Sequence, residues 1–176
     1  MSRNKKHSKL EYFQRNAAGE YIYTGKYMSY VSTEKSRKRL LLELWGLGAA
    51  GTVCLLISGF LPLRSFRGCF YVLLPYMIAL VAAISCLWTI GELTGGGDPL
   101  RQYVHDATVL KLPGRAMVSA VAAMACMLGE IVSCALNRAD GTVGTLIAFF
   151  LLLAAGTGAM VLLRRCIRGG SWQING

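Results

Sequence analysis

One acidic residue of this sequence lies well inside an otherwise apolar run. Glu130 belongs to a run over residues 116–136 and has no Lys or Arg within one helical turn on either side. On a helix of about 100° per residue, its face carries small or weakly polar side chains, whereas the opposite face carries Met, Val and Leu. Because an ionisable group in lipid is rare and costly, we expect Glu130 to point into a helix bundle or toward a partner.

Two chemistries fit a buried carboxyl group of this kind. It could bind a proton or a cation in a small transporter. It could instead hydrogen-bond to a neighbouring helix and contribute about 0.6–2 kcal/mol to helix association. The sequence favours this second, structural interpretation, because no second binding residue accompanies Glu130. Glu130 is nevertheless the candidate proton or ion site of the chain.

The cysteines and histidines form no catalytic or metal-binding pattern. The six cysteines contain no Cys-x-x-Cys pair, no Cys/His cluster has zinc-binding spacing, and His105-Asp106 has no accompanying nucleophile. Cys69 and Cys134 fall at similar depth near the ends of two apolar runs, where they could form a structural disulfide or pack as small apolar side chains. We therefore expect no catalytic residue, no metal and no cofactor. We keep an enzyme that acts on lipids or thiols as one further functional hypothesis, for which the sequence offers no motif.

Four long apolar runs dominate the chain of 176 residues, of which 54% are hydrophobic and 16% charged. The runs cover about residues 40–61, 69–90, 116–136 and 143–163, and a transmembrane helix needs about 20 residues. The short links at 62–68 and 137–142 require antiparallel helical hairpins. The sequence thus predicts an all-α integral membrane protein, a four-transmembrane-helix antiparallel bundle over residues 40–164. A basic cytoplasmic segment (1–39) precedes the bundle, and a short tail (165–176) follows it.

The basic residues are distributed unevenly between the two ends of these runs. Sixteen of the nineteen Lys and Arg residues lie before the first run, between the second and third, or after the fourth. By the positive-inside rule, both termini and the middle segment face the cytoplasm of a plasma (inner) membrane. Membrane tethering also argues against nucleic acid as a partner. Four basic residues before the first run are candidates for contact with anionic headgroups, at about 1 kcal/mol each: Lys35, Arg37, Lys38 and Arg39.

A tyrosine-rich segment lies just before this basic run. Tyr21, Tyr23, Tyr27 and Tyr30 surround a Thr-Gly turn, a pattern typical of a short β-hairpin near residues 21–30. An isolated hairpin is marginally stable in water, so we expect it to lie on the headgroups, the middle segment or another protein. Because tyrosine combines a large contact area with a hydroxyl group, the four tyrosines are candidate partner contacts.

Small residues recur at helical spacing inside the apolar runs, where they allow helix backbones to approach closely. They serve packing within one bundle or association with other chains, and the sequence does not separate these uses. The predicted helix-packing residues are Gly48, Gly51, Ser58, Gly59, Ser119, Ala123, Cys126, Ala155 and Ala159. At the start of the first run, Arg39 and Glu43 have the spacing of a helical ion pair.

These observations support two functional hypotheses. The first is a non-catalytic small polytopic membrane protein that acts as an assembly or partner-binding subunit, in a bilayer with anionic headgroups. Its partners would be further copies of the chain or another membrane protein. The second is a proton-coupled small transporter or channel that uses Glu130 and works as a dimer, since four helices enclose little volume.

Overall fold

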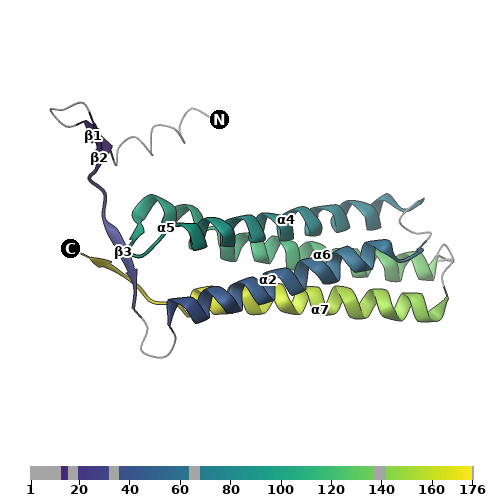
Figure 1. The fold of residues 1–176 in the computed structure, drawn as a ribbon. Coiled ribbons are helices and arrows are strands. Elements are labelled where there is room, and N and C mark those ends of the chain that lie inside the picture. Colours follow the sequence, from purple (N-terminus) through teal and green to yellow (C-terminus); the bar gives the residue numbers. More distant parts are fainter. Residues whose placement is uncertain (1–12, 16–19, 32–35, 64–67, 137–141, 176) are drawn as a thin grey trace.

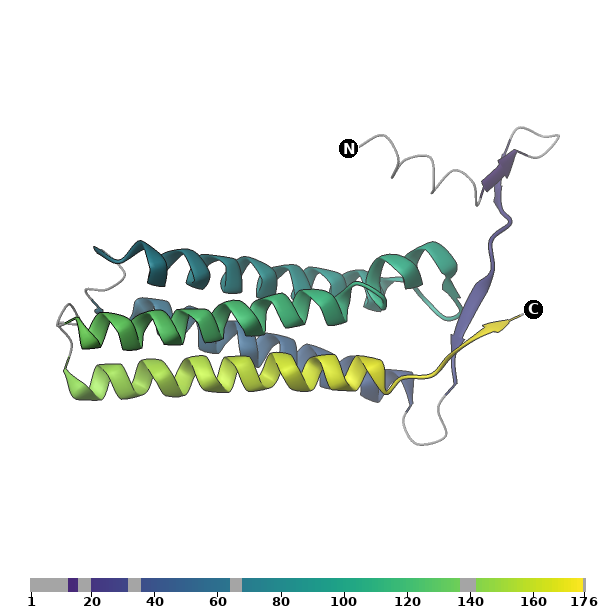
Figure 2. The same cartoon turned by 180° about the vertical axis from the view of Figure 1, so that it is seen from behind.

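The computed structural model of the chain describes residues 13–15, 20–31, 36–63, 68–136 and 142–175. Four long helices lie side by side and alternate in direction (Figures 1 and 2). Each is long and apolar enough to cross a membrane, in agreement with the predicted integral membrane bundle. The helices are α2 (Arg37–Phe60), α4 (Phe70–Gly95), α6 (Leu112–Ala135) and α7 (Val143–Arg168).

The helices match the predicted spans at one end and extend past them at the other. At the loop end, where Phe60, Phe70, Ala135 and Val143 lie, every boundary falls within one residue of the prediction. The opposite end of the bundle is covered by a three-stranded sheet and is the capped end. There each helix is three to five residues longer than its predicted span. The added turns are rich in charged residues, which end an apolar run without interrupting helical hydrogen bonds. Hydropathy therefore marked the end of the apolar run rather than the end of the helix.

Apolar side chains fill the bundle along its length. Helix α4 packs most extensively on α6, and α2 on α7, whereas the α2–α4 contact is smaller. The outward face of α6, with Met117, Val118 and Val121, is exposed, as predicted for a surface that meets lipid. The largest buried side chains include Leu55, Val72, Phe149 and Leu153 toward the loop end, and Leu44, Ile90, Leu112 and Leu163 toward the capped end.

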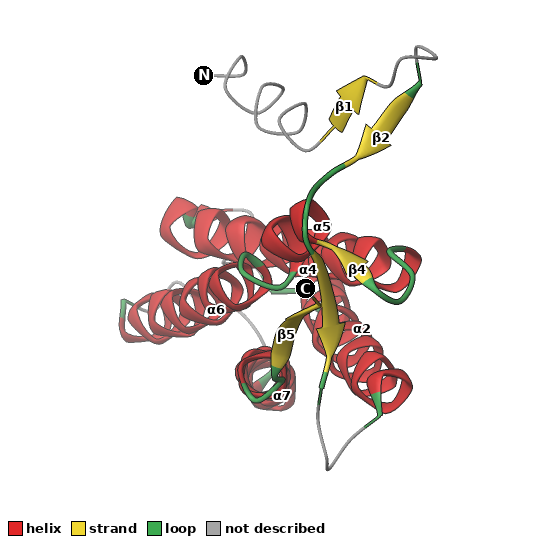
Figure 3. Cartoon of the chain, turned by 90° about the vertical axis from the view of Figure 1, so that its left-hand side faces the viewer, coloured by secondary structure: helices red, strands yellow, loops and turns green. Residues whose placement is uncertain are grey.

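A three-stranded antiparallel sheet covers the capped end of the bundle, and Figure 3 looks onto it. Its central strand β3 (Tyr27–Tyr30) pairs with β4 (Leu100–Arg101) on one side and with β5 (Trp172–Asn175) on the other. The short helix α5 (Gln102–Thr108) follows β4 and leads toward α6. This capping sheet joins the N-terminal segment, the middle segment and the C-terminal tail, so all three lie at the same end of the bundle.

The predicted hairpin over residues 21–30 is wrong, although both of its strands exist. Strand β2 (Tyr21–Tyr23) pairs with β1 (Phe13–Arg15), and this β1–β2 hairpin is separate from the capping sheet. The reason is that β4 and β5 occupy both edges of β3, which leaves no edge for β2. The partners of β3 come from about 70 and 145 residues further along the chain, beyond the reach of local pattern reading.

Candidate functional site

Glu130 lies on α6 near the loop end and faces the interior of the bundle. Its exposed fraction is 0%, and Cys126 and Ser133 on the same face are buried too. Neither carboxyl oxygen has a hydrogen-bond partner among the described residues. The predicted inward orientation is confirmed. The bond to a neighbouring helix that the structural interpretation requires is not found among those residues.

The surroundings of Glu130 come from its own helix and from the close approach of α4. Cys126 and Cys134 lie one turn before and one turn after it on α6. A Cβ atom at Gly129 would lie 3.0 Å from the carbonyl oxygen of Tyr71, so the two backbones meet closely because residue 129 is glycine. Sequence reasoning missed Gly129. Its position beside the buried acid, in a helix interior where glycine is unfavourable, was the available signal.

Other polar groups near the loop end make contacts of their own. The hydroxyl groups of Tyr76 and Ser58 each donate to the carbonyl oxygen of Leu55, at 2.7 Å. Cys69 Sγ lies 3.7 Å from Ser133 Oγ. These groups satisfy hydrogen bonds within the bundle without involving the Glu130 carboxyl group.

The disulfide considered between Cys69 and Cys134 is absent from the structure, in which both cysteines are free. The physical reason is the direction of the side chains on α6. Neighbouring helix positions point about 100° apart, so the turn that aims Ser133 at Cys69 points Cys134 elsewhere. Similar depth in the membrane was not sufficient to bring the two sulfur atoms together.

A carboxyl group in this setting fits a proton better than a metal ion. Among the described residues, no group of three or more His, Cys, Asp or Glu side chains could hold a metal. Divalent cations require several oxygen ligands, whereas a single buried carboxyl group can exchange a proton once water reaches it. Glu130 is therefore a candidate protonation site rather than a candidate metal centre.

The predicted small residues mostly serve contacts within one chain. A Cβ atom at Gly51 would lie 2.9 Å from Met160 Cε and 3.4 Å from Ala159 Cβ, so these residues set the spacing of α2 and α7. Ala155 differs from the prediction because it is exposed. Its neighbour Gly156 lies at the contact with α2 instead. The predicted residues that are buried are Gly48, Gly51, Ser58, Ser119, Ala123 and Cys126.

Gly59 has a different role from the other small residues. It is exposed on α2, yet it adjoins the buried ring of Tyr76 on α4. A Cβ atom at Gly59 would collide with the Tyr76 hydroxyl and lie 2.8 Å from Cζ of the same ring. The glycine therefore provides the space in which Tyr76 reaches the carbonyl oxygen of Leu55.

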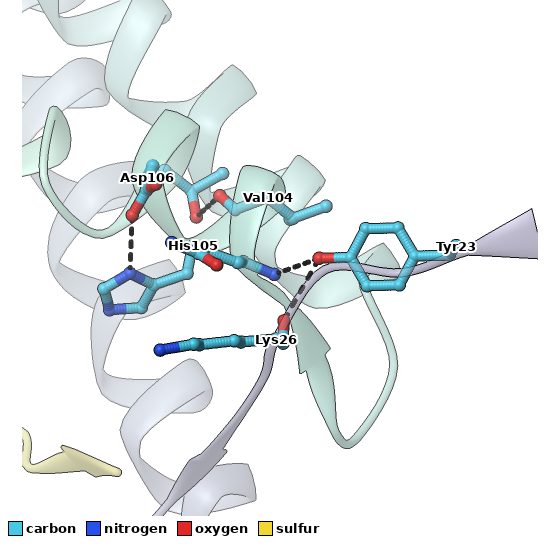
Figure 4. A network of polar contacts seen from close by, with 7 residues as sticks. Tyr23, Lys26, Val104, His105 and Asp106 are labelled. Atoms are coloured by element: carbon cyan, nitrogen blue, oxygen red, sulfur yellow. Dashed lines mark hydrogen bonds and ion pairs between the residues drawn. The ribbon is translucent and has the colours of Figure 1, made fainter. Parts of the chain in front are cut away.

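Tyr23 fastens the base of the β1–β2 hairpin to the rest of the chain. Its hydroxyl donates to the carbonyl oxygen of Lys26 at 3.1 Å and accepts the Gln102 backbone N–H at 3.0 Å (Figure 4). Its ring meets those of Tyr27 and Tyr103 edge-on, with centroids 5.3 and 6.0 Å away. This predicted contact residue is thus engaged in an internal contact between the N-terminal segment and α5.

The other predicted tyrosines divide between internal and exposed positions. Tyr30 packs edge-on against Trp172, with ring centroids 5.3 Å apart, and His105 packs on the same indole ring. Tyr27 is partly exposed, and Tyr21 on the hairpin is 67% exposed. Of the four tyrosines, Tyr21 is the one most available to a partner.

The basic residues at the start of α2 also fall into internal and exposed positions. Arg37 turns inward, where its guanidinium group lies 3.7 Å from Asp98 and 3.4 Å from the carbonyl oxygen of Leu93. Lys38 and Arg39 are exposed at the capped end, and Arg39 forms the predicted ion pair with Glu43 at 3.6 Å. Lys35 lies outside the described residues. Lys38 and Arg39 therefore retain the position expected for headgroup contact, and Arg37 does not.

Sequence reasoning also missed a polar contact between α4 and α6. The guanidinium group of Arg115 donates to the hydroxyl of Thr89 and, at 3.2 Å, to the carbonyl oxygen of Ser85. One turn farther into the bundle, Ser119 Oγ donates to the carbonyl oxygen of Ala79 at 2.9 Å. Arg115 had counted only toward the charge of the middle segment, because a hydrogen bond between distant residues has no local sequence pattern.

Comparisons with known proteins add no relative to these observations. No family model, no curated protein and no solved structure matches the chain. Its function is therefore argued from two features of its own structure. One is the exposed β1–β2 hairpin at the capped end, and the other is the buried carboxyl group of Glu130 near the loop end.

Proposed function

We propose that the chain is a non-catalytic membrane subunit that binds a partner protein through the β1–β2 hairpin. The observation that carries this proposal is the hairpin's position, away from the helices and outside the capping sheet (Figures 1 and 3). A two-stranded sheet alone is marginally stable in water. A partner protein would supply the apolar contact that the bundle does not provide, with Tyr21 in that contact.

The anchoring of the hairpin at its base supports the same proposal. Tyr23 is held by Lys26 and Gln102, and the guanidinium carbon of Arg101 lies 5.5 Å from the centre of its ring. An element that is fixed at its base loses less conformational entropy on binding than a free peptide would. The hairpin is thus held in place for a partner, which is another membrane protein or a second copy of the chain.

The proposed orientation places the capped end, and with it the hairpin, in the cytoplasm of a plasma (inner) membrane. The excess of Lys and Arg in the three segments that meet in the capping sheet supports this orientation. A reporter that is active only in the cytoplasm, fused to the C-terminus, is expected to be active. Activity of an externally restricted reporter at the same position would reverse the orientation.

Native mass spectrometry after gentle extraction tests partner binding. The chain is expected to appear in a defined complex, and deletion of residues 13–22 is expected to release the partner. The deletion stops before Tyr23 and spares β3, because β3 forms the centre of the capping sheet. Substitution of the exposed Tyr21 by Ala is the milder variant and should weaken the complex without changing the melting temperature of the bundle.

Two results would overturn this proposal. One is a lone monomer after mild extraction of the unaltered protein. The other is a complex that survives the deletion of residues 13–22 unchanged. Replacement of the exposed Val31, which lies outside the hairpin, by Ala is the control and should leave the complex intact.

A specific observation favours the second candidate, a proton-coupled carrier or channel that works as a dimer. Glu130 is completely buried, and its carboxyl oxygens have no hydrogen-bond partner among the described residues. An isolated acid of this kind inside a membrane is a candidate step in a proton pathway. Its burial next to the tight contact at Gly129 requires that the helices separate before water reaches it.

Flux measurements in liposomes test this candidate. A carrier that uses Glu130 is expected to give a pH-driven flux that Glu130→Gln abolishes. Glu92→Gln is the matched control, because Glu92 is exposed at the capped end and bonds to the indole N–H of Trp88. Absence of flux from the unaltered protein, or a flux that Glu130→Gln leaves unchanged, would exclude the carrier.

A further inference from the structure

A groove of about 590 Å³ crosses the outer face of α6. Its apolar lining includes Met117, Val118 and Val121 of α6 and Ile78 of α4. Its basic lining consists of Arg164 and Arg168, from the last turns of α7. The groove thus combines an apolar surface with two guanidinium groups at one of its ends.

Small residues create the space for this groove. Gly114 belongs to its lining, and a Cβ atom at that position would meet no atom within 4 Å. Ala122 and Ala125 continue the lining along α6. From Pro113 to Ala125 the helix rises on the order of 18 Å, at 1.5 Å per residue, compared with about 15 Å for one leaflet of a bilayer core. The groove therefore has the length of an acyl chain that extends through one leaflet.

The basic end of the groove lies at the depth of the lipid headgroups. Arg164 is the first residue after the predicted fourth span, which ends at residue 163, and Arg168 is the last residue of α7. The side chain of Arg164 leans over the groove, where Nη1 lies 2.9 Å from Met117 Sδ. A thioether is a weak acceptor, so this contact leaves most of the hydrogen-bonding capacity of the guanidinium group unused.

No acidic side chain neutralises this end of the groove among the described residues. The ion pairs among the described residues join Arg37 to Asp98, Arg39 to Glu43 and His105 to Asp106, and none includes Arg164 or Arg168. Two unpaired guanidinium groups at the headgroup level attract an anionic phosphate, and planar guanidinium groups bind phosphate oxygens well. The positive charge of the site thus favours a lipid with an anionic headgroup, and the apolar part of the groove accepts its acyl chain.

We propose that this groove binds one anionic phospholipid. Its phosphate contacts Arg164 and Arg168, and one acyl chain lies along Met117, Val118 and Val121. The site differs from the general attraction of Lys38 and Arg39 to anionic headgroups, because it holds a single lipid in one position. It is independent of both the partner-binding and the carrier proposals.

Native mass spectrometry of the full chain, released from nanodiscs, tests the site. Phosphatidylglycerol is compared with phosphatidylcholine of the same acyl chains, and the unaltered protein is expected to retain one phosphatidylglycerol molecule. Arg164→Ala with Arg168→Ala should weaken this retention about tenfold to thirtyfold. Arg165→Ala is the matched control, because Arg165 is exposed on the same turn but does not line the groove. It should retain the lipid as the unaltered protein does.

A second variant tests the groove without changing a charge. Gly114→Phe places an aromatic ring in the groove, and its Cβ atom would meet no other atom within 4 Å. The variant should also abolish retention of phosphatidylglycerol. Gly158→Phe is its control, since Gly158 is equally open but lies outside the groove. Equal retention of the two lipids by the unaltered protein would overturn the proposal. Undiminished retention of phosphatidylglycerol by Gly114→Phe would overturn it as well. This second variant tests the proposal even if the double arginine variant does not fold.

Discussion

The two ends of the bundle bury polar groups of different kinds. At the capped end, polar side chains link segments that are distant in sequence. Arg37 pairs with Asp98, and the indole N–H of Trp45 donates to Thr94 Oγ1 at 3.1 Å. Toward the loop end, Glu130 has no hydrogen-bond partner among the described residues, although it is completely buried. At the capped end, the buried atoms without a partner among the described residues are single N–H groups, Arg37 Nε and Trp172 Nε1, whereas toward the loop end both oxygens of a carboxyl group lack one.

This difference bears on which buried polar groups stabilise the fold. Polar groups that are buried and satisfied are consistent with stability, whereas a buried and unsatisfied carboxyl group opposes it. Departures from local consistency are expected at functional or strained sites. The buried carboxyl group of Glu130 therefore stays the candidate functional group of the bundle, and its effect on stability is open to measurement.

The largest effect is expected from Gly59→Ala, near the loop end. The added methyl group would displace the Tyr76 ring and break its hydrogen bond to the carbonyl oxygen of Leu55. Overpacking costs about 1–3 kcal/mol, and a lost hydrogen bond about 1 kcal/mol more. The melting temperature in nanodiscs should fall clearly. Gly46→Ala, on the same helix with open space around its Cβ position, is the control and should not lower it.

Removal of the Arg115 guanidinium group tests the structural role of polar contacts near the capped end. Arg115→Met keeps the length of the side chain and removes the bonds to Thr89 and to the carbonyl oxygen of Ser85. Because hydrogen bonds to charged groups contribute about 1.5–3 kcal/mol, we expect a loss of about 2 kcal/mol. The measurement is the free energy of unfolding, with Lys111→Met at an exposed position as the control. An unchanged stability would remove the contrast between the two ends.

Glu130→Met is expected to change stability in the opposite direction. Methionine has a similar volume and no polar group, so the variant removes an unsatisfied buried carboxyl group. Such a group costs about 1–3 kcal/mol, and we expect the bundle to gain on the order of 1 kcal/mol. A loss of stability in the same unfolding measurement would show instead that Glu130 holds the helices together, as the structural interpretation of the sequence proposed.

The sequence predicted the helices well because their signal is local and long. Each span is a long apolar run, interrupted by a charged residue only at Glu43 and Glu130, and the loop-end boundaries agreed within one residue. The capping sheet had no comparable signal. Strand β4 is two residues long, β5 has four, and neither alternates clearly enough to be recognised as the partner of β3. Pairings between strands this short and this distant in sequence are decided by the fold of the helices between them.

The candidate site was predictable in its direction but not in its contacts. The small face of α6 placed Glu130 inside the bundle, and the structure agrees. The hydroxyl groups of Tyr76, Ser58 and Ser133 make their contacts with Leu55 and Cys69, and no spacing rule predicts in which direction such a group points. The same limit explains why the sequence left open whether Cys69 and Cys134 form a disulfide, whereas both are free in the structure. Depth follows from the sequence, whereas the angle of a side chain around its helix also depends on how the helices pack.

The smallest effect on stability is expected from Tyr23→Phe. Tyr23 lies between the β1–β2 hairpin and the capping sheet, so the variant shows whether the hairpin can loosen while the sheet stays intact. The variant keeps the ring contacts with Tyr27 and Tyr103 and removes the hydrogen bonds to Lys26 and Gln102. It should loosen the hairpin by about 1 kcal/mol without lowering the melting temperature of the bundle. Hydrogen exchange is expected to rise over residues 20–26 and to stay unchanged in α4 and α6. Tyr21→Phe, at an exposed position, is the control, and equal exchange in both variants would show that the Tyr23 hydroxyl does not anchor the hairpin.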